Sequence, residues 1–172
     1  MSELSSVYAR VRLSRAALQR FLDALIAPID RNQDWGVLGA QVPSLLSMVR
    51  YPGLATNRSW LDQVQGRQEA QSDWTYEEST GEFRFHMLQV DENLIEYVAV
   101  FNVLRSLGDF KDSDGEDFAV IYPYYFYDSV DAVCRIRKGS SSLQLGAIDS
   151  PEFRAFMSAA DRWLEAVTNR LS

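Results

Sequence analysis

The stretch 94–107 places the strongest restriction on how this chain can fold. Its apolar residues recur at helical spacing, and Val100 and Val103 widen the apolar surface further. A helix that is apolar around most of its circumference has to be covered on several sides. The pattern therefore predicts a helix at the centre of the core, with acidic residues at its start and Gly108 at its end. The apolar face consists of Leu94, Tyr97, Val98, Phe101, Leu104 and Leu107.

Alternating apolar and polar residues predict strands on both sides of this helix. Glycine-containing turns join two pairs of them into hairpins, with Gly81 in the first turn and Gly139 in the second. Because the strands cluster along the chain, we expect an α+β fold with a mainly antiparallel sheet, and a layered α/β fold is the alternative. The expected strands are 7–13, 74–78, 82–90, 118–122, 130–138 and 140–145.

Three to five helices are expected to pack with this sheet. Ser14 is suited to cap a helix that starts at Arg15 and is ended by Pro28. The run 149–152, a capping residue followed by proline, marks the start of the last helix. The length of 172 residues and the 47% hydrophobic content fit a single domain over 1–172. The buried stripe of the first helix is Leu18, Phe21, Leu22 and Leu25. Shorter helices are expected over 44–50 and 59–68.

The chain is acidic, with 17 Lys and Arg against 24 Asp and Glu and a net charge of −7. A general nucleic-acid binder needs a basic face, and attraction to anionic lipids needs clustered cations. The composition therefore argues against nucleic-acid and membrane partners. The N-terminus does not resemble a secretory signal, and apolar runs are too short for a membrane span, so we expect a cytoplasmic location.

The single histidine, His86, and the single cysteine, Cys134, limit the available chemistry. They exclude an internal disulfide framework and cysteine-rich zinc sites. Nucleophilic catalysis needs a nucleophile with a base nearby, and no such motif surrounds either residue. Cys134 is expected to be a buried strand residue. We therefore predict no catalytic residue, no metal site and no cofactor.

The acidic loop 109–117 is the first candidate for binding. Asp112, Asp114 and Glu116 alternate along it, and hard cations favour such oxygen ligands. The spacing does not match an EF-hand, because glycine falls at the fourth position and proline at the twelfth. We interpret the loop, which ends in Asp117, as a solvated turn that presents carboxylates to a partner.

The segment 122–128 is unusually rich in tyrosine. Strand parity places Tyr125 and Tyr127 on the face opposite to the one that fits the core, near Asp128 and Asp131. Tyrosine is enriched at interfaces because it combines rigid apolar area with a polar tip. These four residues are candidate contact residues, and burial of both faces under helices is the alternative.

Negative charge is concentrated in two segments, 69–92 and 109–131. Each contains seven acidic residues and one basic residue, which gives a net charge of −6. If the two segments meet in space, they form one strongly negative face. Such a face accelerates association with a basic partner and selects against acidic ones, so we predict a partner with a basic binding surface.

A small acidic α+β domain with these two features, 109–117 and 122–131, and without a catalytic motif resembles the bacterial immunity proteins that neutralise secreted toxins. The resemblance implies a stoichiometric inhibitor that binds a cognate toxin and blocks its active site. The candidate contact residues are Asp112, Asp114, Glu116, Asp117, Tyr125, Tyr127, Asp128 and Asp131.

Two functions from other classes remain open. An acidic secretion chaperone for an effector protein is also small, but it dimerises and holds an unfolded segment, so gel filtration would distinguish it. A small enzyme that depends on carboxylates assembled by the fold is the other. Metal dependence, or a deep pocket with perturbed carboxylates, would indicate that class.

Overall fold

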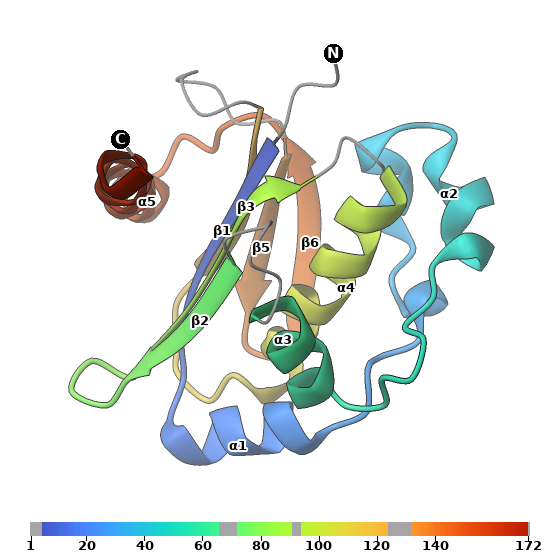
Figure 1. The fold of residues 1–172 in the computed structure, drawn as a ribbon, viewed down its shortest axis with the longest axis horizontal. Helices are drawn as coiled ribbons and strands as arrows, with labels where there is room; N and C mark the ends of the chain where they lie inside the picture. Colours follow the sequence, from blue (N-terminus) through green and yellow to red (C-terminus); the bar gives the residue numbers. More distant parts are fainter. Residues whose placement is uncertain (1–4, 66–71, 91–93, 124–131, 172) are drawn as a thin grey trace.

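A six-stranded sheet forms the centre of the molecule (Figure 1). The computed structural model describes residues 5–65, 72–90, 94–123 and 132–171. The strand order is β2-β3-β1-β4-β5-β6, and every neighbouring pair is antiparallel. The predicted α+β class with an antiparallel sheet is therefore confirmed. The strands are β1 (Ser5–Arg12), β2 (Ser72–Glu77), β3 (Glu82–Val90), β4 (Asp117–Pro123), β5 (Ala132–Arg137) and β6 (Ser140–Leu145).

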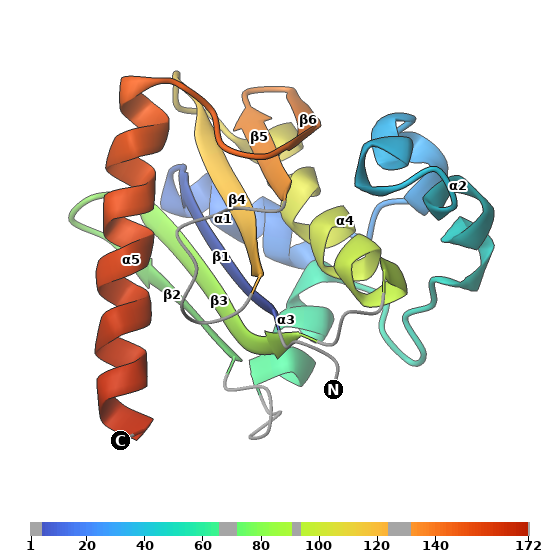
Figure 2. The same ribbon diagram turned by 90° about the horizontal axis from the view of Figure 1, so that it is seen from above.

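Helices cover the two faces of the sheet unequally. One face carries α1, α3 and α4, whereas α5 alone crosses the other face (Figure 1). Figure 2 shows that α2 lies outside α4, away from the sheet. Because β4 lies inside the sheet and both faces are covered, its alternate side chains are apolar on both sides. The helices are α1 (Arg15–Asp23), α2 (Val42–Leu45), α3 (Asn57–Gln65), α4 (Leu94–Phe110) and α5 (Pro151–Leu171), with 3-10 turns at Ile29–Arg31, Asp34–Leu38 and Leu46–Met48.

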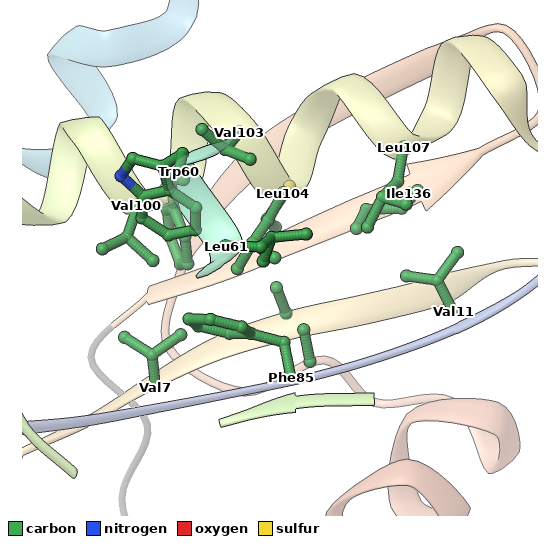
Figure 3. Close-up of a cluster of buried hydrophobic side chains, with 14 of the residues drawn as sticks. Val7, Val11, Trp60, Leu61, Phe85, Val100, Val103, Leu104, Leu107 and Ile136 are labelled. Carbon is green, nitrogen blue, oxygen red and sulfur yellow. The ribbon is translucent and has the colours of Figure 1, made fainter. Parts of the chain in front are cut away.

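The larger core lies between the sheet and α4, as the apolar stretch 94–107 predicts (Figure 3). Ten of the 17 residues of α4 are buried. Phe101 and Leu104 are fully buried there, and Phe85 of β3 is only 1% exposed. Full burial of one such side chain contributes about 1.5–3 kcal/mol, so this face of the sheet supplies most of the apolar stabilisation.

The smaller core lies under α5 on the opposite face. Its centre is Phe118 of β4, which contacts Phe153 and Phe156 at ring-centroid distances of 5.1 and 5.4 Å. The predicted helix start is confirmed, because the hydroxyl of Ser150 accepts a hydrogen bond from the amide of Phe153 at 3.1 Å. Within the described part of the chain, no helix is both long and apolar enough to cross a membrane.

Gly108 does not end the central helix, contrary to the sequence-based expectation. It lies inside α4, where its carbonyl accepts a hydrogen bond from the amide of Gly139 at 2.7 Å. A Cβ atom on Gly108 would lie only 2.6 Å from the carbonyl oxygen of Ser140. The glycine is therefore required because the β5–β6 turn approaches the helix closely, not because the helix terminates there.

Two further expectations about helices need correction. The first helix ends at Asp23, well before Pro28, and Leu25 lies beyond it with 73% of its surface exposed. The backbone of Leu25 forms an isolated antiparallel bridge with Thr56, so the residue contributes to the structure through its backbone and not through burial of its side chain. The expected helix over 44–50 is also divided into the short helix α2 and a 3-10 turn. The cap by Ser14 is confirmed by a 3.1 Å hydrogen bond from the amide of Ala17 to its hydroxyl.

Candidate functional site

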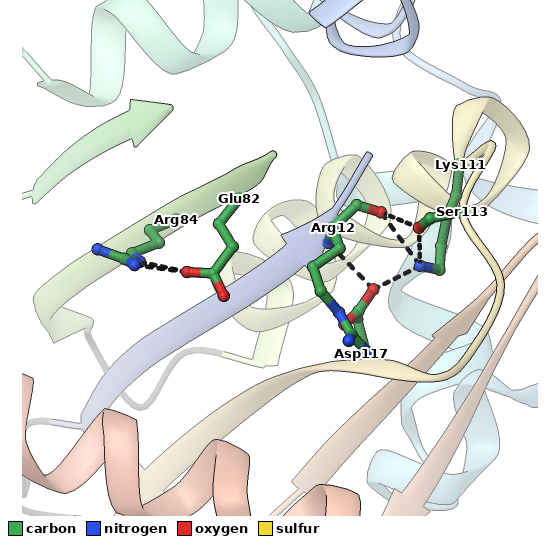
Figure 4. A network of polar contacts seen from close by, with 6 residues as sticks. All are labelled: Arg12, Glu82, Arg84, Lys111, Ser113 and Asp117. Atoms are coloured by element: carbon green, nitrogen blue, oxygen red, sulfur yellow. Dashed lines mark hydrogen bonds and ion pairs between the residues drawn. The ribbon is translucent and has the colours of Figure 1, made fainter. Parts of the chain in front are cut away.

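The acidic loop packs against the junction between β1 and α1. Lys111 is fully buried, and its ammonium group donates to Asp117 at 2.6 Å, to Ser113 at 2.6 Å and to the carbonyl of Arg12 at 3.1 Å (Figure 4). The other oxygen of Asp117 accepts from the guanidinium of Arg12 at 3.0 Å. These contacts fix a loop without regular secondary structure to a strand about a hundred residues away.

Asp117 is therefore an interior residue and not part of a contact surface, which corrects the sequence-based prediction. Its side chain is only 3% exposed, and it also accepts the backbone N–H of Arg12 at 3.0 Å. A buried carboxylate of this kind is stable because it has two cationic partners and a backbone donor.

Asp112 and Asp114 lie at the surface of the same loop. Asp112 accepts hydrogen bonds from both the hydroxyl and the backbone N–H of Ser14, the latter at 2.9 Å. The hydrogen bond from the Ser14 hydroxyl, and then the one from the Ser14 amide, hold the pKa of Asp112 below its usual value. Desolvation acts in the opposite direction but has a smaller effect. Asp114, two residues further on, is also exposed.

Glu116 is placed between two arginines of β5. Its carboxylate lies 2.9 Å from Arg135 and 2.6 Å from Arg137, and its side chain is 14% exposed. At the other end of the loop, Asp109 forms a two-point ion pair with Arg31. Most carboxylates of the loop therefore have a cation from a distant part of the chain.

The acidic segment 69–92 meets the acidic loop at the junction between β1 and α1. The amide of Leu13 donates to the carbonyl of Gly81 at 2.9 Å, and the hydroxyl of Tyr76 donates to the carbonyl of Leu13 at 3.0 Å. Desolvation raises the pKa of Tyr76, and the charges of Glu78 and Asp112 raise it further, so both segments act on one side chain.

The meeting of the two segments does not form a uniformly negative face among the described residues. Arg84 pairs with Glu77 at 3.1 Å and with Glu82, and Arg15 pairs with Glu78 at 2.8 Å. Strand β3 and the start of α1 thus supply arginines that pair with these carboxylates. The surface is therefore a mosaic of both signs, with exposed carboxylates on the acidic loop and on the β2–β3 hairpin.

The tyrosine-rich part of the predicted surface falls outside the described residues. Tyr125, Tyr127, Asp128 and Asp131 belong to 124–131, which the structure does not describe. The residues on either side, Pro123 and Ala132, lie at the opposite end of the sheet from Asp117, because β4 spans Asp117–Pro123 and β5 is antiparallel to it.

His86 and Cys134 are packed against other side chains of the molecule. The His86 ring lies 4.6 Å from the Trp163 ring of α5, and burial lowers its pKa while Asp73 opposes the shift. Cys134 is completely buried, which raises the pKa of its thiol to about 12. A thiol with this pKa is protonated at neutral pH and is a poor nucleophile. No cluster of three potential metal ligands occurs within 5–65, 72–90, 94–123 and 132–171.

Sequence reasoning missed a polar cleft of about 220 Å³, which we call the α4 cleft. It lies between α4, the chain that follows α1 and the β5–β6 turn. Two polar residues of α4, Asn102 and Arg105, line it although both are almost fully buried. The only sequence signal is that these residues interrupt an otherwise apolar helix. Its other lining residues are Ala27, Arg31, Asn32, Ser106, Asp109, Gly139, Ser140 and Ser141.

A second cleft, of about 210 Å³, lies between α3, α4 and the chain before α3. Trp60, Tyr51 and Met87 line it together with Arg50 and Glu96. The hydroxyl of Tyr51 donates to the carbonyl of Ala99 at 3.0 Å, and burial raises its pKa to about 12.

Comparison of the chain with protein-family models, curated protein sequences and solved structures gave no match in any of the three.

Proposed function

We propose that this chain is a non-catalytic protein-binding domain that inhibits a cognate toxin by stoichiometric binding, as immunity proteins do. The observation that supports this proposal is the fixed acidic loop. Lys111 and Ser113 attach it to the backbone of Arg12, while Asp112 and Asp114 remain at the surface. Ordering a loop before association reduces the entropy that binding has to overcome.

The partner of such a surface has basic groups placed between acidic ones. Exposed carboxylates occur on the loop at Asp112 and Asp114 and on the hairpin at Glu78. Two exposed arginines belong to the same region, since Arg12 pairs with Asp117 and Arg15 pairs with Glu78. A fixed pattern of both signs gives more specificity than a uniform charge, because a wrong partner brings like charges together. We expect association to become slower as salt concentration rises.

The decisive experiment isolates the complex from the native host with a tagged chain and identifies the bound protein. We expect that protein to arrest growth when it is produced alone and to be neutralised at a 1:1 ratio by this chain. The double variant Asp112→Lys/Asp114→Lys should weaken binding. The double variant Asp30→Lys/Asp62→Lys makes the same charge change at two exposed positions outside the acidic loop, so it serves as the matched control and should bind as the unaltered chain does.

Other outcomes would replace the proposal. A captured protein without toxicity, held by a dimer of this chain as an unfolded segment, would indicate a secretion chaperone. Turnover of a substrate by the isolated chain would indicate an enzyme. An inhibitory complex unaffected by the Asp112 and Asp114 changes would move the contact surface elsewhere, with Tyr125 and Tyr127 as the next residues to replace.

A further inference from the structure

The α4 cleft contains a buried arginine with an unused pair of donors. The side chain of Arg105 is 2% exposed and is fixed on three sides. It donates to Asp34 at 2.7 Å and to the hydroxyl of Ser141 at 3.1 Å, and its guanidinium lies 4.7 Å from the centre of the Trp35 ring. Its Nη1 atom is buried and has no hydrogen-bond partner within the described residues. Leaving such a donor unpaired is unfavourable, so the position favours an acceptor.

The neighbouring residue of the cleft offers the opposite group. Asn102 lies one helical turn before Arg105 on α4 and is 1% exposed. Its side-chain nitrogen donates to the carbonyl of Ala27 at 2.8 Å and to the hydroxyl of Tyr51 at 3.2 Å, which fixes the amide orientation. Its Oδ1 atom is buried and lacks a partner in the described part of the chain. Two neighbouring residues that line the cleft therefore carry one unpartnered donor group and one unpartnered acceptor within the described residues.

The charges around the cleft are balanced. Arg105 is neutralised by Asp34, and Arg31, at the rim, is neutralised by Asp109. An anion would bring one uncompensated charge into this site, and so would a cation. The volume corresponds to about seven water molecules at ~30 Å³ each and is smaller than the ~300–1,000 Å³ of most ligand pockets. The occupant that fits is small, neutral and both a donor and an acceptor.

From these observations we propose that the α4 cleft binds a carboxamide group. The amide carbonyl would accept from Nη1 of Arg105, and the amide N–H would donate to Oδ1 of Asn102. A carboxylate of the same shape could accept from Arg105 but could not donate to Asn102. Two sources supply this chemistry: a free small amide, or an Asn or Gln side chain on a partner protein. Asp109 belongs to both the cleft and the acidic loop, so a partner bound to the loop would be close enough to provide it.

The test uses the full-length ¹⁵N-labelled chain and NMR titration with propionamide and, separately, propionate. We expect propionamide to cause saturable shifts of the backbone amides of 139–141 and of the side-chain N–H groups of Arg105 and Asn102. Propionate should bind about tenfold more weakly, because it leaves the acceptor of Asn102 unpaired. Equal affinity for the two probes would overturn the carboxamide assignment. Absence of saturable shifts would show that the cleft holds only water.

A blocking variant shows whether the shifts arise in the cleft. Ala27→Leu fills the cleft with a larger side chain but keeps the backbone carbonyl that accepts from Asn102. We expect this variant to lose the propionamide shifts while its thermal midpoint stays close to that of the unaltered chain. Retention of the shifts would place the binding elsewhere and reject the proposal. If the variant does not fold, the comparison of propionamide with propionate on the unaltered chain still decides the question.

A last pair of probes distinguishes the two sources. Free glutamine and the tripeptide Gly-Gln-Gly carry the same side-chain amide with different flanking charges. Tighter binding of the tripeptide supports a partner side chain, and tighter binding of glutamine supports a free metabolite. These measurements need no toxin, so they succeed or fail independently of the proposed inhibitory function.

Discussion

Two groups of ion pairs lie at the same end of the sheet and differ mainly in burial (Figure 4). In the first, Lys111 and Asp117 are 0% and 3% exposed and are joined to Arg12. In the second, Arg84 is 41% exposed and pairs with Glu77 and Glu82. The first group draws its charges from Arg12 and from the acidic segment 109–131, and the second draws them from the acidic segment 69–92. The chemistry is the same, but water screens the second group and is excluded from most of the first.

The difference shows that a high local density of carboxylates does not define a binding surface. Asp117 and Asp114 are three residues apart, yet one holds the loop to the sheet and the other is exposed. Removing a partner from a buried pair leaves an uncompensated charge, whereas removing one from a surface pair exposes a charge that water already solvates. A graded set of substitutions can test this contrast.

The largest effect is expected for Lys111→Met, which keeps the apolar stem and removes the buried charge. The free energy of unfolding should fall by about 3–5 kcal/mol, because Asp117 loses its closest cation in a site with little access to water. Urea denaturation at neutral pH measures this change. The double variant Lys111→Met/Asp117→Asn should recover part of the loss, and a loss below about 1 kcal/mol for the single variant would contradict the assignment.

A smaller effect is expected for Asp112→Asn, whose side chain is exposed but doubly hydrogen-bonded to Ser14. We expect a loss of about 1 kcal/mol at pH 7, since solvent weakens these charged hydrogen bonds. The pKa of Asp112 is lowered in the folded state, so its contribution is present above the unfolded value of about 3.9 and is lost as pH falls further. Unfolding measured at pH 7 and at pH 3 should therefore show the variant and the unaltered chain converging at low pH. A difference that is constant across this range would show that ionisation of Asp112 is irrelevant.

The surface group is expected to contribute less. Arg84→Met should reduce the free energy of unfolding by less than about 1 kcal/mol, because the ion pairs with Glu77 and Glu82 are partly solvated. Salt sharpens the comparison: raising ionic strength should remove this small difference but leave most of the Lys111→Met effect. Denaturation in low and high salt provides the measurement. If both variants respond to salt alike, burial does not separate the two groups.

The smallest effect on stability is expected for Asp114→Lys. The residue is exposed, so the free energy of unfolding, obtained from thermal denaturation, should change by no more than about 0.5 kcal/mol. The same substitution should slow association with a basic partner, which stopped-flow or surface-binding kinetics can measure once that partner is in hand. A large loss of stability would show that Asp114, like Asp117, is structural.

Much of the fold follows from local patterns. The i, i+3 and i+4 apolar spacing of 94–107 predicts the buried central helix, and alternation predicts the hairpin strands β2 and β3. The expectations for Gly108 and Leu25 are wrong because a local pattern does not include contacts from distant residues. Gly108 has the context of a helix end but lies inside α4, where Ser140 approaches closely, and Leu25 continues the apolar spacing of α1 but lies beyond it, where its backbone pairs with Thr56.

The candidate site was less predictable. The exposed positions of Asp112 and Asp114 agree with a turn signal in the sequence, whereas the burial of Asp117 depends on a strand that pairs with β4 from far along the chain. The α4 cleft had no usable signal, because Asn102 and Arg105 acquire their meaning from Asp34 and Ser141 in other elements. A lone polar residue on an apolar helix does not reveal which groups it meets.

The sequence by itself determined most of the residues that face the core, with Leu25 as an exception, because burial follows the period of each helix and strand and that period is a local property. It also determined that two segments carry a charge of −6 each. Only the tertiary structure decided what those charges do. The register between β1 and β4 places Arg10 opposite Phe118, which brings Arg12 to Asp117. Pairing between distant strands thus neutralises charges that appear uncompensated along the chain, since electrostatic energy depends on distance in space and on exclusion of water.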